Sequence, residues 1–403
     1  MLHDDRECRD GAGDHPGGGA WHGTLEGARP GGAFLGYPGL FHMSEPPPNG
    51  AQRWVDRLEH QLDANWSAIR KARIATKRKR TRLRQAFEDR ISPDTSLVVF
   101  GSIARDEVTS GSDLDWILLV DGQAIPEHGV QKHTIASELA KLKFVTPGRS
   151  GVFGCMVGSH DIVHEIGGED DTNSNTTRRV LLLLESFPVG KREAYDRVRR
   201  QILNRYLRDD RGLVYGGGMS GFPRFLLNDF TRYWRTVTVD FVYKQRAEAG
   251  EKWALRNAKL RMSRKLVFAS GLLRCLFCHL DPDAADARQV LRAPEHDITK
   301  LLAYMEGELA QTPLELLARA ASRPAIERTT ARKLFDSYDR FLGVLDNKAK
   351  RETLEKMSQP DMATSAVWAE IRDSSRDFHS GLLELFFGKD RDLRKLAAYY
   401  GIF

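Results

Sequence analysis

A polar loop between two apolar segments constrains this chain more than any other feature. The first segment, 97–100, ends at Gly101-Ser102, and ten residues separate Ser102 from Asp113. Asp113 and Asp115, one residue apart, then lead into a second apolar segment. The side chains of a strand alternate in direction, so these two aspartates point to the same face. We therefore predict two strands joined by a loop, with two carboxylates side by side.

These residue types suit metal and phosphate chemistry. Two neighbouring carboxylates repel each other and are costly to bury unless a cation lies between them. Mg²⁺ commonly binds one or two carboxylates together with substrate phosphates, and Mn²⁺ also accepts oxygen ligands. Gly101 lets the backbone approach a phosphate closely, and Ser102 offers a hydroxyl and an N–H. The alternative is a polar turn with two solvated aspartates, but both flanking segments are too apolar for an exposed sheet edge.

The ordered pattern Gly101-Ser102, spacer, Asp113-x-Asp115 resembles the signature of the DNA polymerase beta-like nucleotidyltransferase superfamily. The stretch GSIARDE…SDLDW is most similar to the branch that contains the uridylyltransferase of bacterial nitrogen signalling proteins. The phosphohydrolase and ligand-sensing regions of that branch are not recognisable in this chain. The resemblance implies an α/β (α+β) catalytic domain with a small mixed sheet, followed by an all-α domain.

The resemblance also implies a reaction. An NTP would be the substrate, Asp113 and Asp115 would hold divalent ions, and an NMP would pass to an acceptor hydroxyl with release of pyrophosphate. The Gly-Ser pair would bind the phosphates, and Arg105 and Lys259 are candidates for neutralising charge on the leaving group. Many relatives have glycine where this chain has Asp106, so we expect a stiffer phosphate loop here.

A third carboxylate usually comes from a later strand in such enzymes. The segment 161–166 reads as that strand, and Asp161 and Glu165 share one face of it. Either residue is a candidate third ligand, and either is a candidate base for the acceptor hydroxyl. Asp170 and Asp171 lie just beyond, in an expected loop. The sequence does not choose among these acids.

The chain divides into four parts by composition. Its Gly-rich start, 1–42, has no apolar periodicity and cannot bury enough surface to offset the entropy of ordering, with Met43 as an alternative start. The parts that we expect are a disordered Gly/Pro-rich segment at 1–45, an N-terminal basic helix at 46–95, the catalytic domain at 96–190 and a helical domain at 191–403.

The expected N-terminal helix carries an apolar stripe and a basic run. Trp54, Leu58, Leu62 and Trp66 recur at steps of four, which is typical of a helix with one buried face. The run 71–84, KARIATKRKRTRLR, is strongly basic. We interpret it as the solvated face of a long helix, and contact with nucleic acid or phosphate is the alternative.

A second basic helix is predicted over 253–273, with apolar residues on two nearly opposite sides. Its cations include Arg256 and Lys259, and cations beside apolar faces need anionic partners. They would either pair with acids of the preceding helix, such as Asp229 and Asp240, or line the cleft and bind the triphosphate. The sequence leaves both alternatives open.

Composition sets the remaining limits. The chain has 403 residues, of which 41% are hydrophobic and 29% charged, as in water-soluble globular proteins. No apolar run approaches the ~20 residues that span a bilayer, and the first residues lack the apolar core of a signal peptide. We therefore expect a cytoplasmic protein without membrane contact. A net charge of +6 is compatible with polyanionic partners.

Three hypotheses of function follow. The first is a metal-dependent enzyme that transfers an NMP to a hydroxyl of a protein or small molecule. The second is an enzyme that makes nucleotide second messengers or extends RNA, which the basic run favours. The third is a non-catalytic nucleotide-binding protein, and the intact pair of Asp113 and Asp115 argues against it.

Overall fold

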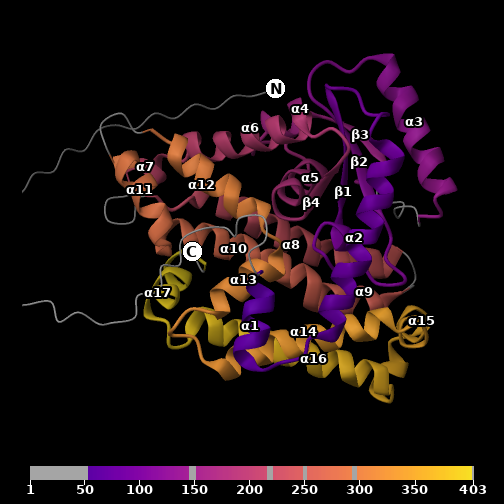
Figure 1. Ribbon diagram of the computed structural model, residues 1–403, viewed down its shortest axis with the longest axis vertical. Coiled ribbons are helices and arrows are strands. Elements are labelled where there is room, and N and C mark those ends of the chain that lie inside the picture. The colour runs from indigo at the N-terminus through magenta and orange to yellow at the C-terminus, as the bar shows by residue number, and fades with distance from the viewer. Residues whose placement is uncertain (1–52, 145–150, 216–220, 248–251, 293–296, 402–403) are drawn as a thin grey trace, which may run out of the picture. The chain divides into compact units, whose positions relative to one another are not determined.

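The computed structural model describes residues 53–144, 151–215, 221–247, 252–292 and 297–401, shown as coloured ribbon in Figure 1. These residues belong to one unit, Ser44–Phe403. The predicted disorder of 1–42 and the alternative start at Met43 lie outside the described residues. None of the described helices is long and apolar enough to cross a membrane.

A mixed four-stranded sheet forms the base of the site. Its strand order is β3-β2-β1-β4, with β2 antiparallel to β1 and parallel to β3, and with β4 antiparallel to β1. The first strand and the second are the two predicted apolar segments, and they lie at the centre of the sheet. The strands are β1 (Thr95–Phe100), β2 (Asp115–Val120), β3 (Cys155–Gly158) and β4 (Ser186–Val189).

The two central strands are buried on both faces. Ile117 and Leu119 of β2 belong to one hydrophobic cluster, shared with the helical region, whereas Trp116 and Leu118 belong to another, shared with α2 (Ser67–Phe87) and α3 (Pro126–Lys141). The alternation confirms the predicted strand. Because Asp115 has the same parity as Ile117, its side chain is directed to the face that the helical region covers.

The predicted strand 161–166 is wrong. Strand β3 ends at Gly158, and the helix α4 (Ser159–Val163) follows at once. Ile162 and Val163, adjacent in sequence, are both buried, which a one-turn helix allows and an alternating strand does not. Helix α5 (Asn173–Leu184) then carries the apolar run of residues 180–184.

The predicted single helix near the N-terminus is two helices. Helix α1 (Trp54–Leu62) ends at Asp63, whose φ of +50° is left-handed, and α2 begins four residues later. The apolar stripe nevertheless continues across the break. The ring of Trp66 stacks on Phe335 at a centroid distance of 4.7 Å, so the turn is itself part of the core.

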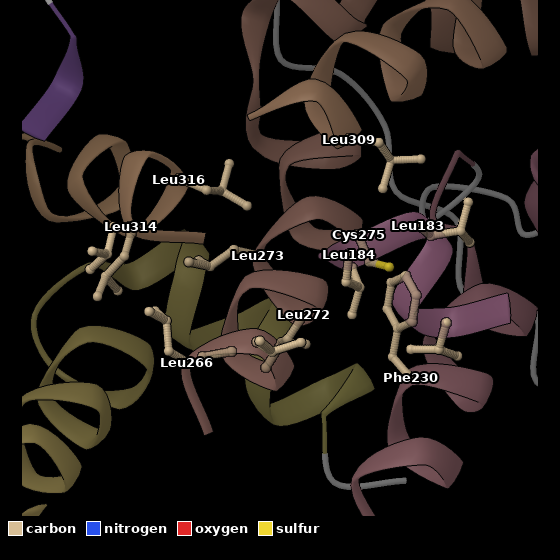
Figure 2. Packing of buried hydrophobic residues seen from close by; sticks show 14 of the residues in the cluster. Leu183, Leu184, Phe230, Leu266, Leu272, Leu273, Cys275, Leu309, Leu314 and Leu316 are labelled. Atoms are coloured by element: carbon tan, nitrogen blue, oxygen red, sulfur yellow. The ribbon is translucent and has the colours of Figure 1, made fainter. Parts of the chain in front are cut away.

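The rest of the described chain is helical, as predicted. Helix α10 (Lys265–Leu280) packs against both α8 (Arg224–Ala247) and α13 (Pro313–Ala321). Figure 2 shows Leu273 of α10 near Leu316 of α13, and Phe230 of α8 near Leu184 of α5. The helices of this region are α6 (Glu193–Asp209), α7 (Arg211–Tyr215), α8 (Arg224–Ala247), α9 (Trp253–Lys259), α10 (Lys265–Leu280), α11 (Ala285–Arg292), α12 (Thr299–Ala310), α13 (Pro313–Ala321), α14 (Arg328–Asp346), α15 (Lys348–Lys356), α16 (Ala366–Phe387) and α17 (Arg391–Tyr400).

A buried ion network joins α5 to α8. Arg179 is fully buried, and its Nη2 lies 2.8 Å from Asp171 Oδ2 and 2.7 Å from Asp229 Oδ2. Arg232 reaches Asp171 Oδ2 at 2.6 Å, and the hydroxyl of Tyr206 donates to Asp229. Asp229 is therefore engaged by Arg179, which corrects its expected role as a partner for the cations of 253–273.

We expect Asp171→Asn to lower the free energy of unfolding by about 3–5 kcal/mol, because it leaves buried arginine charge without its partner. Burial acts to raise the pKa of Asp171, but hydrogen bonds from Arg179 and from the Gly167 N–H outweigh it and hold the pKa below its ordinary value. When folding lowers the pKa of a carboxyl, that carboxyl adds to the free energy of unfolding. The addition is present above about pH 4 and is lost as the pH falls through the lowered pKa of the folded state.

Urea denaturation of the wild type and the variant, at neutral pH and in acid, measures this difference. The exposed neighbour Asp170 supplies the control, because Asp170→Asn should leave stability unchanged. Equal stability of the Asp171 variant and the wild type at neutral pH would contradict the prediction.

Candidate active site

The Gly-Ser loop turns sharply at the end of β1. Gly101 has a φ of +73°, a left-handed conformation that favours glycine, and it opens a short 3-10 turn, Gly101–Ile103. A Cβ at this position would lie 3.6 Å from Asp115 Oδ2. In the sheet register Phe100 pairs with Asp115, so the loop begins directly beside the second aspartate. The predicted proximity of Gly101-Ser102 to the acid pair is thus present.

The two aspartates differ in their surroundings. Burial, and then the neighbouring charge of Asp113, raise the pKa of Asp115 to about 7. Burial acts in the same direction on Asp113, but Lys259, a backbone hydrogen bond, Arg351 and Arg105 together outweigh it and lower the pKa of that carboxyl. The ammonium Nζ of Lys259 lies 3.8 Å from Asp113 Oδ1. The two aspartates therefore carry more negative charge than Lys259, the lysine beside Asp113, can neutralise.

The oxygen atoms of Asp113, Asp115 and Ser102 fit a hard divalent cation that is also bound by a substrate. Two carboxylates beside a loop hydroxyl match the ligands that Mg²⁺ takes when substrate phosphates complete its shell. Within the described ranges, no group of three or more His, Cys, Asp or Glu residues is arranged to hold a metal ion. The residues thus suit an ion that arrives with a phosphate ligand rather than one enclosed by protein alone.

A π-helical turn shapes the cationic side of the site. The predicted continuous helix over 253–273 is interrupted at Leu260–Arg264, where the backbone forms a π turn between α9 and α10. Such turns are rare and frequently lie at functional sites. Here Lys259, Ser263 and Arg264 line the cavity beside the acid pair. Arg256, one turn earlier, is not among the cavity-lining residues.

The cavity itself has a volume of about 190 Å³ and joins residues from distant parts of the chain. Its cations are Lys259, Arg264 and Arg351, besides Arg105. Its other wall is largely apolar and aromatic, with Tyr233 and Asp240 from α8 at its polar points. That wall comprises Val152, Phe153, Leu181, Tyr233, Val237, Phe241, Leu342 and Leu345.

Arg105, a sequence candidate for neutralising the leaving group, is bound by two protein carboxylates. Its Nε lies 2.8 Å from Glu107 Oε2, and its Nη1 donates to Glu185. The hydroxyl of Tyr338 in α14 donates to the other oxygen of Glu107 at 2.8 Å. Arg105 is buried between the two carboxylates, so its charge is already neutralised, although the residue lines the cavity.

Asp161 and Glu165 are not brought to the cavity. Asp161 lies exposed on α4, Glu165 lies in the loop that follows, and neither lines the cavity. On the side of β3, the Gly154 N–H donates to the Trp116 carbonyl at 2.7 Å, and the residue before it, Phe153, occupies the cavity wall. The acids that line the cavity beside Asp113 are Glu107, Glu185 and Asp240. Sequence reasoning did not select Glu107 or Glu185, and it named Asp240 only as an ion-pair partner for the cations of 253–273.

Asp106 is fixed by the N-terminal helices. Its φ of +65° is left-handed, which gives a physical reason for the glycine implied at this position. Its carboxylate lies 2.7 Å from Arg53 and 2.8 Å from Arg80, and Arg80 also donates to the carbonyls of Ile103 and Ala104. Part of the basic run 71–84 thus holds the phosphate loop.

We expect Asp115→Asn to stabilise the metal-free protein at neutral and higher pH. When folding raises the pKa of a carboxyl, that carboxyl adds to the free energy of unfolding. The addition is full below about pH 4 and is lost as the pH rises through the pKa of the folded state, here about 7. Removing the ionisable group should therefore raise the free energy of unfolding above pH 7, by roughly 1.4 kcal/mol for each unit of the pKa difference.

Urea denaturation with a chelator present, across this pH range, tests the expectation. Stability of the Asp115 variant and the wild type should converge near about pH 4, where both side chains are neutral. Asp161→Asn, at an exposed site, is the control and should follow the wild type throughout. If the Asp115 variant is no more stable than the wild type at alkaline pH, Asp115 does not lie in the buried, negatively charged surroundings described here.

Comparison with known proteins adds one match. Residues 80–146 match the family model described as nucleotidyltransferase domain, and this range contains Gly101, Ser102, Asp113 and Asp115. No curated protein and no solved structure matches the chain, so no particular branch of the superfamily is supported. The match begins within α2 and extends just past α3. The segment that carries the acid pair is thus a nucleotidyltransferase domain of the DNA polymerase beta-like kind.

Proposed function

We propose that this protein transfers an NMP from an NTP to a hydroxyl group of a protein or small molecule and releases pyrophosphate. One observation carries the proposal. Asp113 lines a cavity together with the Gly-Ser loop, Lys259, Arg264 and Arg351, and the carboxylate of Asp115 lies directly behind Gly101 of that loop. An anion of high charge that brings its own divalent cation is complementary to both groups.

The residues then take distinct roles. Gly101 and Ser102 offer backbone N–H groups and a hydroxyl to the phosphates. Lys259 and Arg264 offset the charge of the triphosphate and of the departing pyrophosphate, whereas Arg351 is held by Glu355 at 3.0 Å and by the carbonyl of Gly111. Asp113 and Asp115 would hold Mg²⁺ or Mn²⁺, which when bound neutralises phosphate charge and lowers the pKa of a coordinated hydroxyl.

The shape of the site helps to choose between transfer to a protein or small molecule and extension of RNA. Among the residues that the structure describes, a bounded cavity, in place of a long basic groove, favours a nucleotide and a small reacting group over a long strand of RNA. Basic residues that face solvent on α2, such as Lys77, Arg78 and Arg82, keep a nucleic-acid contact as the second candidate. The retained acid pair favours an enzyme over a non-catalytic binding protein.

We expect the purified protein to transfer radioactive label from an α-labelled NTP to an acceptor in host lysate, with Mg²⁺ or Mn²⁺ present. Each of the four NTPs is supplied separately, and the product is sized as protein, nucleic acid or small molecule. Asp113→Asn should abolish transfer because it removes a ligand of the metal.

Asp161→Asn and Glu165→Gln serve as matched controls. Both remove an acid of the same domain that the structure places outside the cavity, so both should retain wild-type transfer. Label transfer by the Asp113 variant at the wild-type rate would exclude the proposed reaction.

We also expect Lys259→Met to weaken binding of a non-hydrolysable NTP by about 1–3 kcal/mol, the usual effect of losing one charged hydrogen bond. Arg256→Met is the matched control, because Arg256 lies one turn away and does not line the cavity. Isothermal titration in the presence of Mg²⁺ measures both affinities, and a thermal melt checks that each variant is folded. Equal weakening by the two substitutions would place the triphosphate elsewhere.

A further inference from the structure

A second cavity lies along one face of α8, next to the nucleotide cavity. It has a volume of about 730 Å³. Asn228, Thr231 and Arg235 line it at steps of three and four residues, Asp240 lines it five residues beyond Arg235, and Asn173 at the start of α5 lines it as well. Among its lining residues only Asp240 also lines the nucleotide cavity, so the two cavities meet at this side chain.

Asp240 differs from the other acids of the nucleotide cavity. Glu107 and Glu185 are buried and bound by Arg105, and Asp113 faces Lys259. Asp240 is exposed, and in the described part of the chain its carboxylate has no ion pair or hydrogen bond. It is therefore the cavity acid whose oxygens remain available to a second ligand.

The chemistry of the second cavity indicates what that ligand carries. Arg232 is neutralised by Asp171, to which it donates at 2.6 Å. Arg235 is exposed and has no carboxylate partner among the described residues, so its charge is available to an anion. The amides of Asn173 and Asn228 can bond hydroxyl groups in either direction.

We propose that this second cavity is the acceptor site, that it takes a small sugar-like compound bearing a phosphate, and that Asp240 contacts the reacting hydroxyl. The proposal rests on the proposed nucleotidyl transfer. Arg235 and Asp240 are five residues apart, so they are separated by about 7.5 Å along the helix axis. This separation suits a phosphate and a hydroxyl on opposite sides of one sugar ring.

The acceptor oxygen forms a bond to the α-phosphorus, and the bond from that phosphorus to the bridging oxygen of the β-phosphate breaks. The electron pair of the broken bond leaves with pyrophosphate. The acceptor proton passes to the Asp240 carboxylate and then to water, so the enzyme is regenerated.

Ligand binding tests the site without any turnover. We expect isothermal titration to show saturable binding of ribose 5-phosphate to the wild type, and at least tenfold weaker binding to Arg235→Glu. Unphosphorylated ribose should bind more weakly than its phosphate. Arg208→Glu, an exposed arginine of α6 outside the cavity, should bind like the wild type. No saturable binding, or equal binding by the Arg235 variant, would overturn the assignment.

Turnover tests Asp240. With labelled NTP and ribose 5-phosphate, we expect Asp240→Asn to slow transfer by about 10²–10⁴-fold. The Kd for a non-hydrolysable NTP should stay unchanged. A wild-type rate in this variant, while Asp113→Asn is inactive, would reject Asp240 and leave nucleotidyl transfer standing. A wild type that transfers label from no NTP to any acceptor would reject the proposed function itself.

Discussion

Repulsion between two neighbouring carboxylates beside a partly buried cavity is the constraint around which this site is built. Asp115 begins β2 on the face that the helical region covers, so water does little to screen its charge, whereas the side chain of Asp113, two residues earlier, is 45% exposed. Cations must therefore come from that region. Lys259 supplies the nearest one, at 3.8 Å from Asp113, and its own burial lowers the pKa of the lysine. Each charge is tolerated because the other is present.

A second balance of charge holds the loop between them. Arg105 is a cation in the loop, yet it is bound by Glu107 and Glu185, and Glu107 is bound in turn by Tyr338. This chain of contacts connects the phosphate loop to β4 and to α14. Arg351 of α15 adds a further connection, because it donates to the carbonyl of Gly111. The loop that presents Gly101 is thus fixed by residues more than 200 positions later.

The sequence predicted the parts of the site that local chain geometry determines. Gly101, Ser102, Asp113 and Asp115 belong to two adjacent strands and the loop between them, so their proximity follows from the hairpin. Asp161 and Glu165 were selected from a six-residue alternation, and a run so short does not separate a strand from a helical turn. Strand β3 lay just upstream, at Cys155–Gly158.

The rest of the site depends on tertiary packing. Helical periodicity gave no reason to choose between Arg256 and Lys259, whereas in the structure Lys259, Ser263 and Arg264 line the cavity at the π turn Leu260–Arg264. No local pattern marks Arg351 or assigns Asp240 to the cavity, because their helices reach the site from elsewhere in the fold. The same limit explains Asp229, whose partner Arg179 lies 50 positions earlier in the chain.

The buried network of Arg179 has a consequence for the chemistry. It binds α5 to α8 through Asp171 and Asp229, and α8 carries Tyr233 and Asp240 into the nucleotide cavity. Helix α5 carries Leu181 into that cavity and ends beside Glu185. The ion pairs therefore fix the position of Asp240 relative to the acid pair, although none of them contacts a substrate. Since a displacement of about 1 Å can slow a reaction 10²-fold, interior charges that stabilise the fold also set the geometry in which nucleotide and acceptor would meet.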